Sequence, residues 1–474
     1  MSKTWKLSIV VGMMVLLAFG AMAQDVDRNK TGANSGRPVP QAAPRPTPNW
    51  SVPESSIERP EDAGLRMHTN IVFRSLDGTD KPTHLSSPAE IPNFGPLATD
   101  KVEETPQSLG CIYLGSPKSA GCVPNYGVSH GPSAGGSGAI ALVDAFDDPT
   151  AASDLAFFDK YWGLAAAKFI KIKMTNSCSS PPPDPGWAGE ETLDIEYAHV
   201  YAPGATIILV EACSNLNSDL LAAETVAFNY IAVHYGWGTV SNSWGGGEFS
   251  GETSYDSLFT TFGNGDQGAG ITAFASAGDS GCGAAWPSSN PWLVSAGGTS
   301  IYRNATGQAF VSEGCWSGSG GGDSAYETMG VATDYQYPMC GNDASACNPA
   351  NRLTPDFALN SDPYSGVALY SIYAFGGWSC CWGGTSEASP SLAAIVNRAN
   401  NQLSSCWYNP FNGWCFYTNA ENNLLYSQLP TNKAYGQNFY DITPATGPDT
   451  NGCTVAKRWD YCTGVGSPRG VLGK

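Results

Sequence analysis

Four apolar runs recur along the chain from about residue 135 onward and carry the clearest structural signal. They lie between segments with helical patterns, and none of them alternates strictly between apolar and polar residues. Strands that are buried on both faces have this pattern, as in parallel sheets covered by helices on both sides. We therefore predict an α/β domain with a mostly parallel central sheet, helices on both faces and long Gly-rich loops. The four runs are Ala139–Val143, Ile207–Val210, Ile271–Ala275 and Val367–Tyr370.

The chain before these runs divides by composition. Residues 1–23 combine a basic start, an apolar core and an Ala-Met-Ala end, which is the pattern of a secretory signal peptide cleaved after Ala23. Residues 24–63 are rich in proline and predict a disordered linker. We expect residues 64–130 to form a short N-terminal extension and residues 131–474 to form the main domain. No other run approaches the ~20 apolar residues of a membrane span, so no membrane contact is expected after signal cleavage.

The balance of charged residues restricts which partners the protein can bind and indicates the pH at which it works. There are 24 Lys and Arg residues against 42 Asp and Glu residues, and the formal net charge is −18. This balance excludes the basic surface that nucleic acids and anionic membranes require. Few cations also mean little positive self-repulsion when carboxylates become protonated, which fits a secreted protein that works in acid.

The cysteines indicate disulfides rather than a metal cluster. Their number is fourteen, and no two of them are separated by two residues. An even number of cysteines in a secreted chain predicts several bridges. We expect the neighbours Cys380 and Cys381 to bond to different partners and to brace the loop that follows.

The heptapeptide Gly384-Thr385-Ser386-Glu387-Ala388-Ser389-Pro390 is the strongest candidate for chemistry. It follows a Gly-rich loop and precedes the apolar, helix-like run Leu392–Val396. This spacing places the Ser386 hydroxyl at a helix N-terminus, where free N–H groups favour a developing oxyanion. Pro390 is expected in the first helical turn, where its missing N–H costs little. The heptapeptide is typical of subtilisin-like serine peptidases, and the plainer alternative is a Ser-rich helix cap.

A serine nucleophile needs a base, and the usual histidine is missing from its usual setting. The segment after residue 185 instead predicts a helix with acidic residues in its first turns. Glu190 and Asp194 are four residues apart, so both carboxylates project from one face. At roughly 100° per residue, His199 points about 180° from Glu190 and about 140° from Asp194. We interpret His199 as a structural residue.

These features together resemble the sedolisin family of serine-carboxyl peptidases (peptidase family S53), in which a glutamate replaces the catalytic histidine. The resemblance covers roughly residues 135 to 470, and it implies a subtilisin-like fold and a peptidase catalytic domain over residues 131–474. The matching segments follow the expected order. They are Glu190…Asp194, Tyr201–Ala205, Ser241–Gly245, Ala275–Gly281, Pro287–Pro291, Val294–Thr299, Pro355-Asp356, Asp362-Pro363 and Gly384–Pro390.

The resemblance assigns roles to four residues. Ser386 would be the acyl-forming nucleophile and Glu190 the general base and then acid, with Asp194 sharing a proton with Glu190. Asp279 matches the oxyanion-hole acid and must be protonated to donate a hydrogen bond there. An ordinary turn residue is the alternative for Asp279. Asp144 stays open: it could be the Asp of a conventional triad, a member of the carboxyl network behind Glu190, or a turn residue.

Two parts of the chain depart from the family pattern. The stretch from residue 24 to about 130 is too short for the family's large N-terminal prodomain, which puts self-inhibition and zymogen processing in doubt. The family's calcium loop is only partly matched, because alanine and arginine stand where glycines donate carbonyl oxygens. One structural Ca²⁺ is nevertheless predicted. Its ligands would come from Asp441, Ile442, Ala456, Arg458 and Asp460.

The sequence thus predicts a secreted, monomeric endopeptidase that cleaves polypeptide substrates in acid through an acyl-enzyme on Ser386. Ser243-Trp244-Gly245 would offer a backbone edge to the substrate. Three alternatives stay open. They are a tripeptidyl exopeptidase of the same family, a conventional subtilisin using Asp144 and His199, and a catalytically inactive secreted binding protein on the same scaffold.

Overall fold

The computed structural model describes most of the chain after the Pro-rich tail. The described residues are 50–91, 101–115, 121–127, 131–132, 134–263, 270–330, 335–336, 350–399, 407–408, 415–416 and 420–474. The predicted signal peptide and residues 24–49 of the predicted linker lie outside them. None of the helices among the described residues combines the length and the apolar character that a membrane-spanning helix needs.

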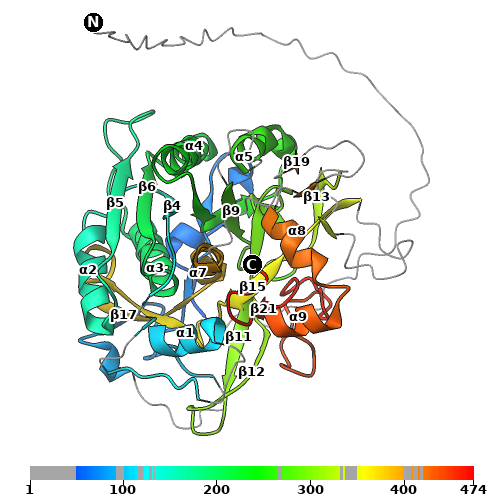
Figure 1. Ribbon diagram of the computed structural model, residues 1–474. Helices are drawn as coiled ribbons and strands as arrows, with labels where there is room; N and C mark the ends of the chain where they lie inside the picture. Colours follow the sequence, from blue (N-terminus) through cyan, green and yellow to red (C-terminus); the bar gives the residue numbers. More distant parts are fainter. Residues whose placement is uncertain are drawn as a thin grey trace, which may run out of the picture. The chain divides into compact units, whose positions relative to one another are not determined.

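An eight-stranded sheet forms the centre of the molecule (Figure 1). Its strand order is β12-β11-β9-β7-β4-β6-β5, and β15 pairs in parallel with β11 beside this path. All pairs are parallel except β11 with β12. The predicted mostly parallel α/β sheet is therefore confirmed. The strands are β4 (Ala139–Ala145), β5 (Lys168–Lys173), β6 (Thr206–Ala212), β7 (Trp237–Asn242), β9 (Gly270–Ser276), β11 (Val294–Arg303), β12 (Phe310–Cys315) and β15 (Phe357–Asn360).

Helices cover both faces of this sheet because successive strand residues point to opposite sides. On β4, Ile140 and Leu142 pack in one core with side chains of α2 (Ala151–Trp162), α3 (Pro185–Tyr201) and α7 (Thr385–Ala399). Val143 and its odd-numbered neighbours pack in a second core, beneath α4 (Asn217–His234) and α5 (Asp256–Gly263). Every residue of β4 is buried, which explains why its sequence shows no alternation.

One predicted strand has a different place from the one expected. The run Val367–Tyr370 forms β16 (Val367–Ser371), which pairs antiparallel with β17 (Gly377–Gly383) outside the central sheet. The other side of β17 pairs with two strands of the N-terminal extension, β2 (Val72–Phe73) and β3 (Thr83–Leu85). This small sheet matters for the site because β17 leads directly into α7.

The N-terminal extension is folded onto the main domain and begins earlier than predicted. Residues 50–63, expected to be part of the disordered linker, form η1 (Glu54–Ser56) and η2 (Pro60–Asp62), and Ser51 pairs with Phe73. The extension also contributes β1 (His68–Thr69), which pairs with β8 (Trp244–Gly247). The remaining elements are η3 (Pro88–Glu90), α1 (Pro106–Leu114), η4 (Glu252–Tyr255), β10 (Ala285–Trp286), β13 (Asp323–Thr328), β14 (Asn351–Leu353), α6 (Ile372–Phe375), β18 (Trp407–Tyr408), β19 (Cys415–Phe416), α8 (Ala420–Ser427), α9 (Asn432–Asn438), β20 (Phe439–Tyr440) and β21 (Ser467–Pro468).

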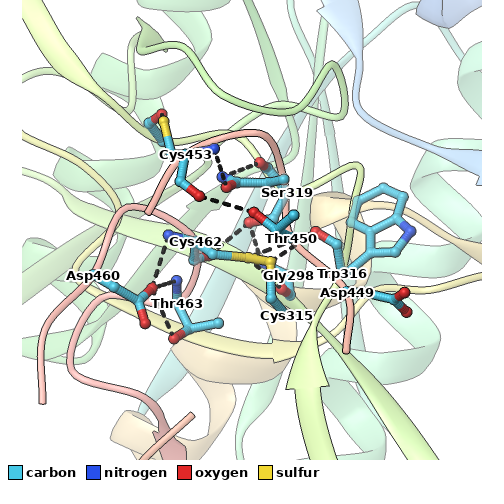
Figure 2. Close-up of a disulfide and its surroundings, with 12 residues drawn as sticks. Gly298, Cys315, Trp316, Ser319, Asp449, Thr450, Cys453, Asp460, Cys462 and Thr463 are labelled. Carbon is cyan, nitrogen blue, oxygen red and sulfur yellow. Dashed lines mark hydrogen bonds between the residues drawn. A yellow bond between two sulfur atoms is a disulfide. The ribbon is translucent and has the colours of Figure 1, made fainter. Parts of the chain in front are cut away.

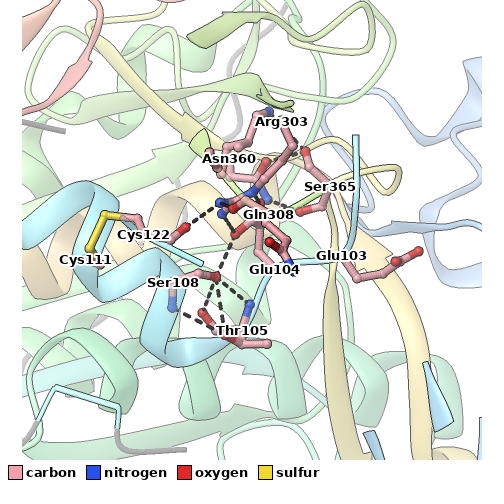
Figure 3. Close-up of polar contacts among 12 residues, drawn as sticks. Glu103, Glu104, Thr105, Ser108, Cys111, Cys122, Arg303, Gln308, Asn360 and Ser365 are labelled. Carbon is pink, nitrogen blue, oxygen red and sulfur yellow. Dashed lines mark hydrogen bonds and ion pairs between the residues drawn. A yellow bond between two sulfur atoms is a disulfide. The ribbon is translucent and has the colours of Figure 1, made fainter. Parts of the chain in front are cut away.

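A buried ion pair attaches the stretch around α1 to the sheet. The Arg303 guanidinium at the end of β11 contacts both carboxylate oxygens of Glu104 and also donates to the carbonyl oxygen of Cys122 (Figure 3). Both charged side chains are fully buried. Removing either partner would leave an uncompensated buried charge, which is strongly destabilising.

Disulfides join parts of the described chain, as the cysteine count predicts. The bridge Cys315–Cys462 links β12 to the C-terminal loop and lies beside Asp460 and Thr463 (Figure 2). The prediction for Cys380 and Cys381 was wrong, because their sulfur atoms bond to each other on β17. The other described bridges are Cys111–Cys122, Cys178–Cys213 and Cys282–Cys453.

Candidate active site

Ser386 lies at the start of α7, as its position in the heptapeptide predicts. Gly384 turns the chain from β17 into the helix with a φ of 106°, a conformation that side chains other than glycine rarely adopt. Ser386 is fully buried, and its hydroxyl donates to the carbonyl oxygen of Ser243 at 3.2 Å. Because the turn leads directly into α7, the hydroxyl and the backbone N–H of Ser386 both lie at the N-terminal end of this helix.

Pro390 has a different position from the one predicted. It lies inside α7 rather than in the first turn, so the helix lacks the N–H that would bond to the carbonyl oxygen of Ser386. The Ser243 hydroxyl approaches that carbonyl at 3.4 Å. Ser243 therefore contacts the nucleophile candidate through both its carbonyl and its hydroxyl, a role that its place in the Ser241–Gly245 segment did not reveal.

Glu190 and Asp194 both lie on the buried helix α3. Asp184 caps this helix by accepting hydrogen bonds from the N–H groups of Gly186 and Trp187, which starts it five residues before Glu190. Asp194 Oδ1 accepts a hydrogen bond of 2.6 Å from the Ser243 hydroxyl. Ser243 thereby connects the acidic helix to the Ser386 turn.

The carboxyl of Glu190 faces an environment that disfavours its charge. Burial raises its pKa well above the usual range, and the charges of Asp194 and Asp144 raise it further. The Ser386 hydroxyl is the polar group that lowers this pKa by approaching the carboxyl. Among the described residues, neither Glu190 oxygen has a hydrogen bond of good geometry.

Asp144 belongs to the carboxyl cluster and not to a turn. It is fully buried near the end of β4, directly opposite Glu211 on β6. Burial and the charge of Glu211 raise the pKa of Asp144 to about 8. Burial raises the pKa of Asp194 as well, and the Asp144 charge adds to that effect. The network role that the sequence left open is thus supported by the tertiary structure.

Asp279 lies beside the Ser386 turn. Its Oδ1 accepts two hydrogen bonds from Thr385, from the backbone N–H at 2.7 Å and from the hydroxyl at 2.8 Å. Its Oδ2 is buried and has no partner among the described residues. Burial raises the pKa of Asp279 to about 7, so in acid this carboxyl carries a proton that it can donate. Sequence reasoning did not give Thr385 this orienting function.

The backbone edge that was predicted to receive substrate is filled by the chain's own N-terminal extension. His68 and Thr69 of β1 pair with Gly245 and Trp244 of β8. The next residue, Asn70, accepts a hydrogen bond of 3.0 Å from the backbone N–H of Ser386. No motif marks Asn70 in the sequence, and only the tertiary structure brings it to the site.

His199 has contacts that keep it separate from this group. Its Nε2 lies 2.8 Å from the carbonyl oxygen of Ala165 and 3.4 Å from a carboxylate oxygen of Asp159. Burial lowers the pKa of the His199 ring. These contacts support the structural interpretation of His199.

Hydrogen bonds link four of the five predicted calcium ligands in two pairs, Asp441 with Arg458 and Ala456 with Asp460. The Asp441 carboxylate accepts the N–H of Arg458 at 2.7 Å, and the Asp460 carboxylate accepts the N–H of Ala456 at 3.2 Å. Arg458 has a φ of 72°, the backbone conformation that favours glycine, and its guanidinium donates to the carbonyl oxygen of Leu429. Arg458 thus adopts a backbone conformation that glycine favours, and its cationic end is bonded to Leu429.

Oxygen donors of this kind suit Ca²⁺. The Asp460 carboxylate, however, already accepts four hydrogen bonds, from the N–H groups of Ala456, Cys462 and Thr463 and from the Thr463 hydroxyl. The carbonyl oxygen of Arg458 already accepts a bond of 3.0 Å from the Tyr435 hydroxyl. The donor atoms are of the type that binds calcium, and the loop holds together through its own hydrogen bonds.

Known proteins resemble this chain over much of its length. Kumamolisin from Bacillus sp. (strain MN-32) is 29% identical over 353 residues, which are 70% of this chain and 58% of that protein. Sedolisin from Pseudomonas sp. (strain 101) is 25% identical over 183 residues, which are 38% of this chain and 28% of that protein. The matches thus span less than two thirds of the length of these relatives. No protein-family model matches the chain.

The fold also has a counterpart among solved structures. Pseudomonas sedolisin, a serine-carboxyl proteinase solved with two molecules of pseudo-iodotyrostatin, superimposes with a TM-score of 0.57 over 78% of this chain and 96% of that one, at 22% identity. This agreement shows the subtilisin-like fold. Together with the sequence matches, it confirms the resemblance to the sedolisins.

Proposed function

We propose that this relative of the sedolisins is a serine-carboxyl endopeptidase that hydrolyses peptide bonds in acid through an acyl-enzyme on Ser386. The proposal rests mainly on one observation: Ser386 is fully buried beside two carboxyl groups of α3, those of Glu190 and Asp194, whose pKa values burial raises. A buried acid pair beside a serine at a helix N-terminus has no evident structural purpose, and perturbed carboxyls of this kind cluster at functional sites.

The first chemical step would be the attack of Ser386. Like charges this close do not ionise together, so the two carboxyls share one proton over the working range. The ionised member accepts the Ser386 proton as Oγ attacks the substrate carbonyl carbon. The resulting oxyanion would receive hydrogen bonds from the Ser386 N–H and from protonated Asp279, whose free Oδ2 lies beside the turn.

The later steps return the proton. Glu190 gives it to the leaving amine, which leaves an ester on Ser386, and water then attacks the ester with Glu190 as base. Asp144 would act through its charge, by raising the pKa of the pair. A calcium ion in the Asp441–Asp460 loop would stabilise the fold of the C-terminal segment and would take no part in these steps.

Secretion and acid action are parts of the proposal. Residues 1–23 support secretion. The raised pKa values of the buried acids support work in acid, because protonated carboxyls fit this interior better than ionised ones. We propose polypeptides as the substrates and a monomer as the active form.

The test is digestion of denatured protein with the full chain and its Ser386→Ala variant from about pH 3 to about pH 7. We expect internal cleavages in acid that the variant does not make, with the cleavage sites identified by mass spectrometry. Successive release of three-residue fragments from the N-terminus would show a tripeptidyl exopeptidase instead. Equal digestion by both proteins would refute the assignment of Ser386, and no digestion by either would favour a binding protein.

A further inference from the structure

The turn that carries Asp279 is fastened to a loop far along the chain. The turn comprises residues 278–282, and the loop, which we call the Asn451 loop, comprises residues 450–453. We propose that the Asn451 loop positions Asp279: it holds the turn so that the Oδ2 atom stays beside the Gly384 turn, where the oxyanion forms, and loosening it lowers kcat. This inference rests on the proposed peptidase function.

The turn itself has little stiffness of its own. Thr385 bonds to the Oδ1 atom of Asp279, and Oδ2 lies 2.6 Å from the point where a Cβ on Gly384 would stand. The residues on either side are glycines in the left-handed region, Gly278 with a φ of 101° and Gly281 with a φ of 75°. Glycine has more conformational freedom than any other residue, so the surroundings must fix where this backbone lies.

The Asn451 loop contacts the turn directly after Asp279. The backbone N–H of Cys282 donates to the carbonyl oxygen of Asn451 at 2.7 Å, and the sulfur of Cys282 is bonded to that of Cys453. A Cβ on Gly281 would stand only 2.8 Å from the same carbonyl oxygen, so the two backbones touch there. A hydrogen bond and a covalent bond thus join the turn and the loop at neighbouring points.

The side chain of Asn451 holds the loop in place. Its Nδ2 donates to the carbonyl oxygens of Ser319 and Tyr461, each at 2.9 Å, and its Oδ1 accepts the N–H of Cys453 at 3.0 Å. The residue is buried. The Thr450 hydroxyl closes the loop by donating to the carbonyl oxygen of Cys453 at 2.8 Å (Figure 2). One buried side chain therefore ties the loop to two other segments of the chain.

One of these segments, residues 318–320, also contacts both ends of the turn. The N–H of Gly281 donates to the carbonyl oxygen of Gly318 at 2.8 Å, and the N–H of Gly320 donates to the carbonyl oxygen of Gly278 at 2.7 Å. The turn thus lies between this segment and the Asn451 loop. Because the Asn451 side chain bonds to the segment and its main chain bonds to the turn, it holds the two supports together.

A displaced Asp279 should affect the transition state more than substrate binding. An oxyanion donor interacts with charge that develops only during the reaction. Asn451→Ala removes three side-chain hydrogen bonds and should lower kcat by roughly tenfold. The limit is the loss on the order of 10²–10³ that follows complete removal of one donor. KM should change by less than about twofold, because uniform substrate binding is untouched.

The experiment measures kcat and KM for hydrolysis of a peptide in acid, below the melting temperature of each protein. Asn451→Ala is compared with wild type and with the double variant Cys282→Ser/Cys453→Ser, which keeps Asn451 and removes the covalent link. Asn438→Ala is the matched control, since its Nδ2 bonds to Gln428 on another part of the C-terminal segment. The control should lower the melting temperature and keep the wild-type kcat. A wild-type kcat in both test variants would overturn the inference, and the cysteine variant decides alone if Asn451→Ala does not fold.

A double-mutant cycle tests whether Asn451 acts through Asp279. In an Asp279→Ala background, Asn451→Ala should cost no further kcat, because the donor that it positions is already missing. Equal losses in both backgrounds would show that Asn451 acts on the fold in general, and would overturn the inference while the peptidase function stands. A wild type that hydrolyses no peptide would remove both proposals.

The pH profile gives an independent measurement. Burial raises the pKa of Asp279 to about 7, and water that reaches a loosened turn should lower that pKa toward the usual value of about 4. The activity of Asn451→Ala should therefore decline at a lower pH than that of wild type. Thr385 and Glu190, the groups that interact with the Asp279 carboxyl, are unchanged in this variant. A decline at the wild-type pH would show that the turn has not moved and would overturn the inference.

Discussion

Replacing Asp279 gives the sharpest test of the proposed chemistry, because the structure distinguishes its two oxygens: Oδ1 is bonded to Thr385, and Oδ2 has no partner among the described residues. Thr385 donates two hydrogen bonds to Oδ1, and its hydroxyl in turn accepts the N–H of Gly278 at 3.1 Å. The Thr385 hydroxyl proton is thereby directed at Oδ1. In Asp279→Asn, the amide oxygen should take the Oδ1 position and the NH₂ group the Oδ2 position.

The preference for this orientation can be worked out from the two bonds. A reversed amide would point its NH₂ group at two donors of Thr385 and lose both bonds. At about 0.5–1.5 kcal/mol for each bond, the productive orientation is favoured by about 1–3 kcal/mol, which is roughly a factor of 5 to 150. The Asn variant should therefore keep an oxyanion donor, and one that cannot ionise. Asp279→Ala keeps none and should lose on the order of 10²–10³ in kcat.

The pH dependence distinguishes the variants. Burial raises the pKa of Asp279 to about 7, and only the protonated carboxyl donates, so wild-type activity should fall as the pH rises through about 7. In Asp279→Asn this decline should move to higher pH. The assay is the initial rate of peptide hydrolysis across the pH range, with kcat and KM separated. Melting temperatures at each pH identify any loss that comes from unfolding.

Two results would refute this reasoning. An Ala variant with nearly wild-type kcat would show that Asp279 only shapes the turn. An Asn variant that loses activity at the same pH as wild type, while still folded, would show that another group sets the decline.

Three further predictions follow from the site and the buried acids. Ser386→Ala and Glu190→Ala should each abolish turnover, and the double variant should be hardly worse, because the residues act as one unit; independent, multiplicative losses in kcat would contradict this. A chelator should lower the melting temperature if the C-terminal loop binds calcium, and Asp460→Ala should remove that sensitivity; identical melting curves with and without chelator would exclude the ion. Burial raises the folded-state pKa of Asp144 and of Glu224, a fully buried residue of α4, to about 8, against about 4 in an unfolded chain. Their contribution to stability is therefore complete below about pH 4 and is lost as the pH rises to about 8. Thermal unfolding across this range should show a falling melting temperature, and a rising one would contradict the burial argument.

The sequence alone determined the features that repeat locally. The apolar runs at Ala139–Val143, Ile207–Val210 and Ile271–Ala275 became strands of the central sheet, because an unbroken apolar stretch of this length is stable only when both faces are covered. Helical periodicity placed Glu190 and Asp194 on the same face of one helix, and both lie on α3.

Only the tertiary structure decided the contacts between distant segments. Asp144 joins the acid cluster because β4 pairs with β6. The sequence of a strand does not reveal which other strand it will pair with. The Cys380–Cys381 bond could not be inferred, because cysteine spacing allows many pairings. Asn70 reaches Ser386 because β1 adds to β8 and β2 adds to β17, and main-chain hydrogen bonds of this kind leave no mark on side-chain pattern. The local pattern of apolar and polar residues follows from the chemistry of each residue. The pairing of distant backbone edges follows from the packing of the whole chain.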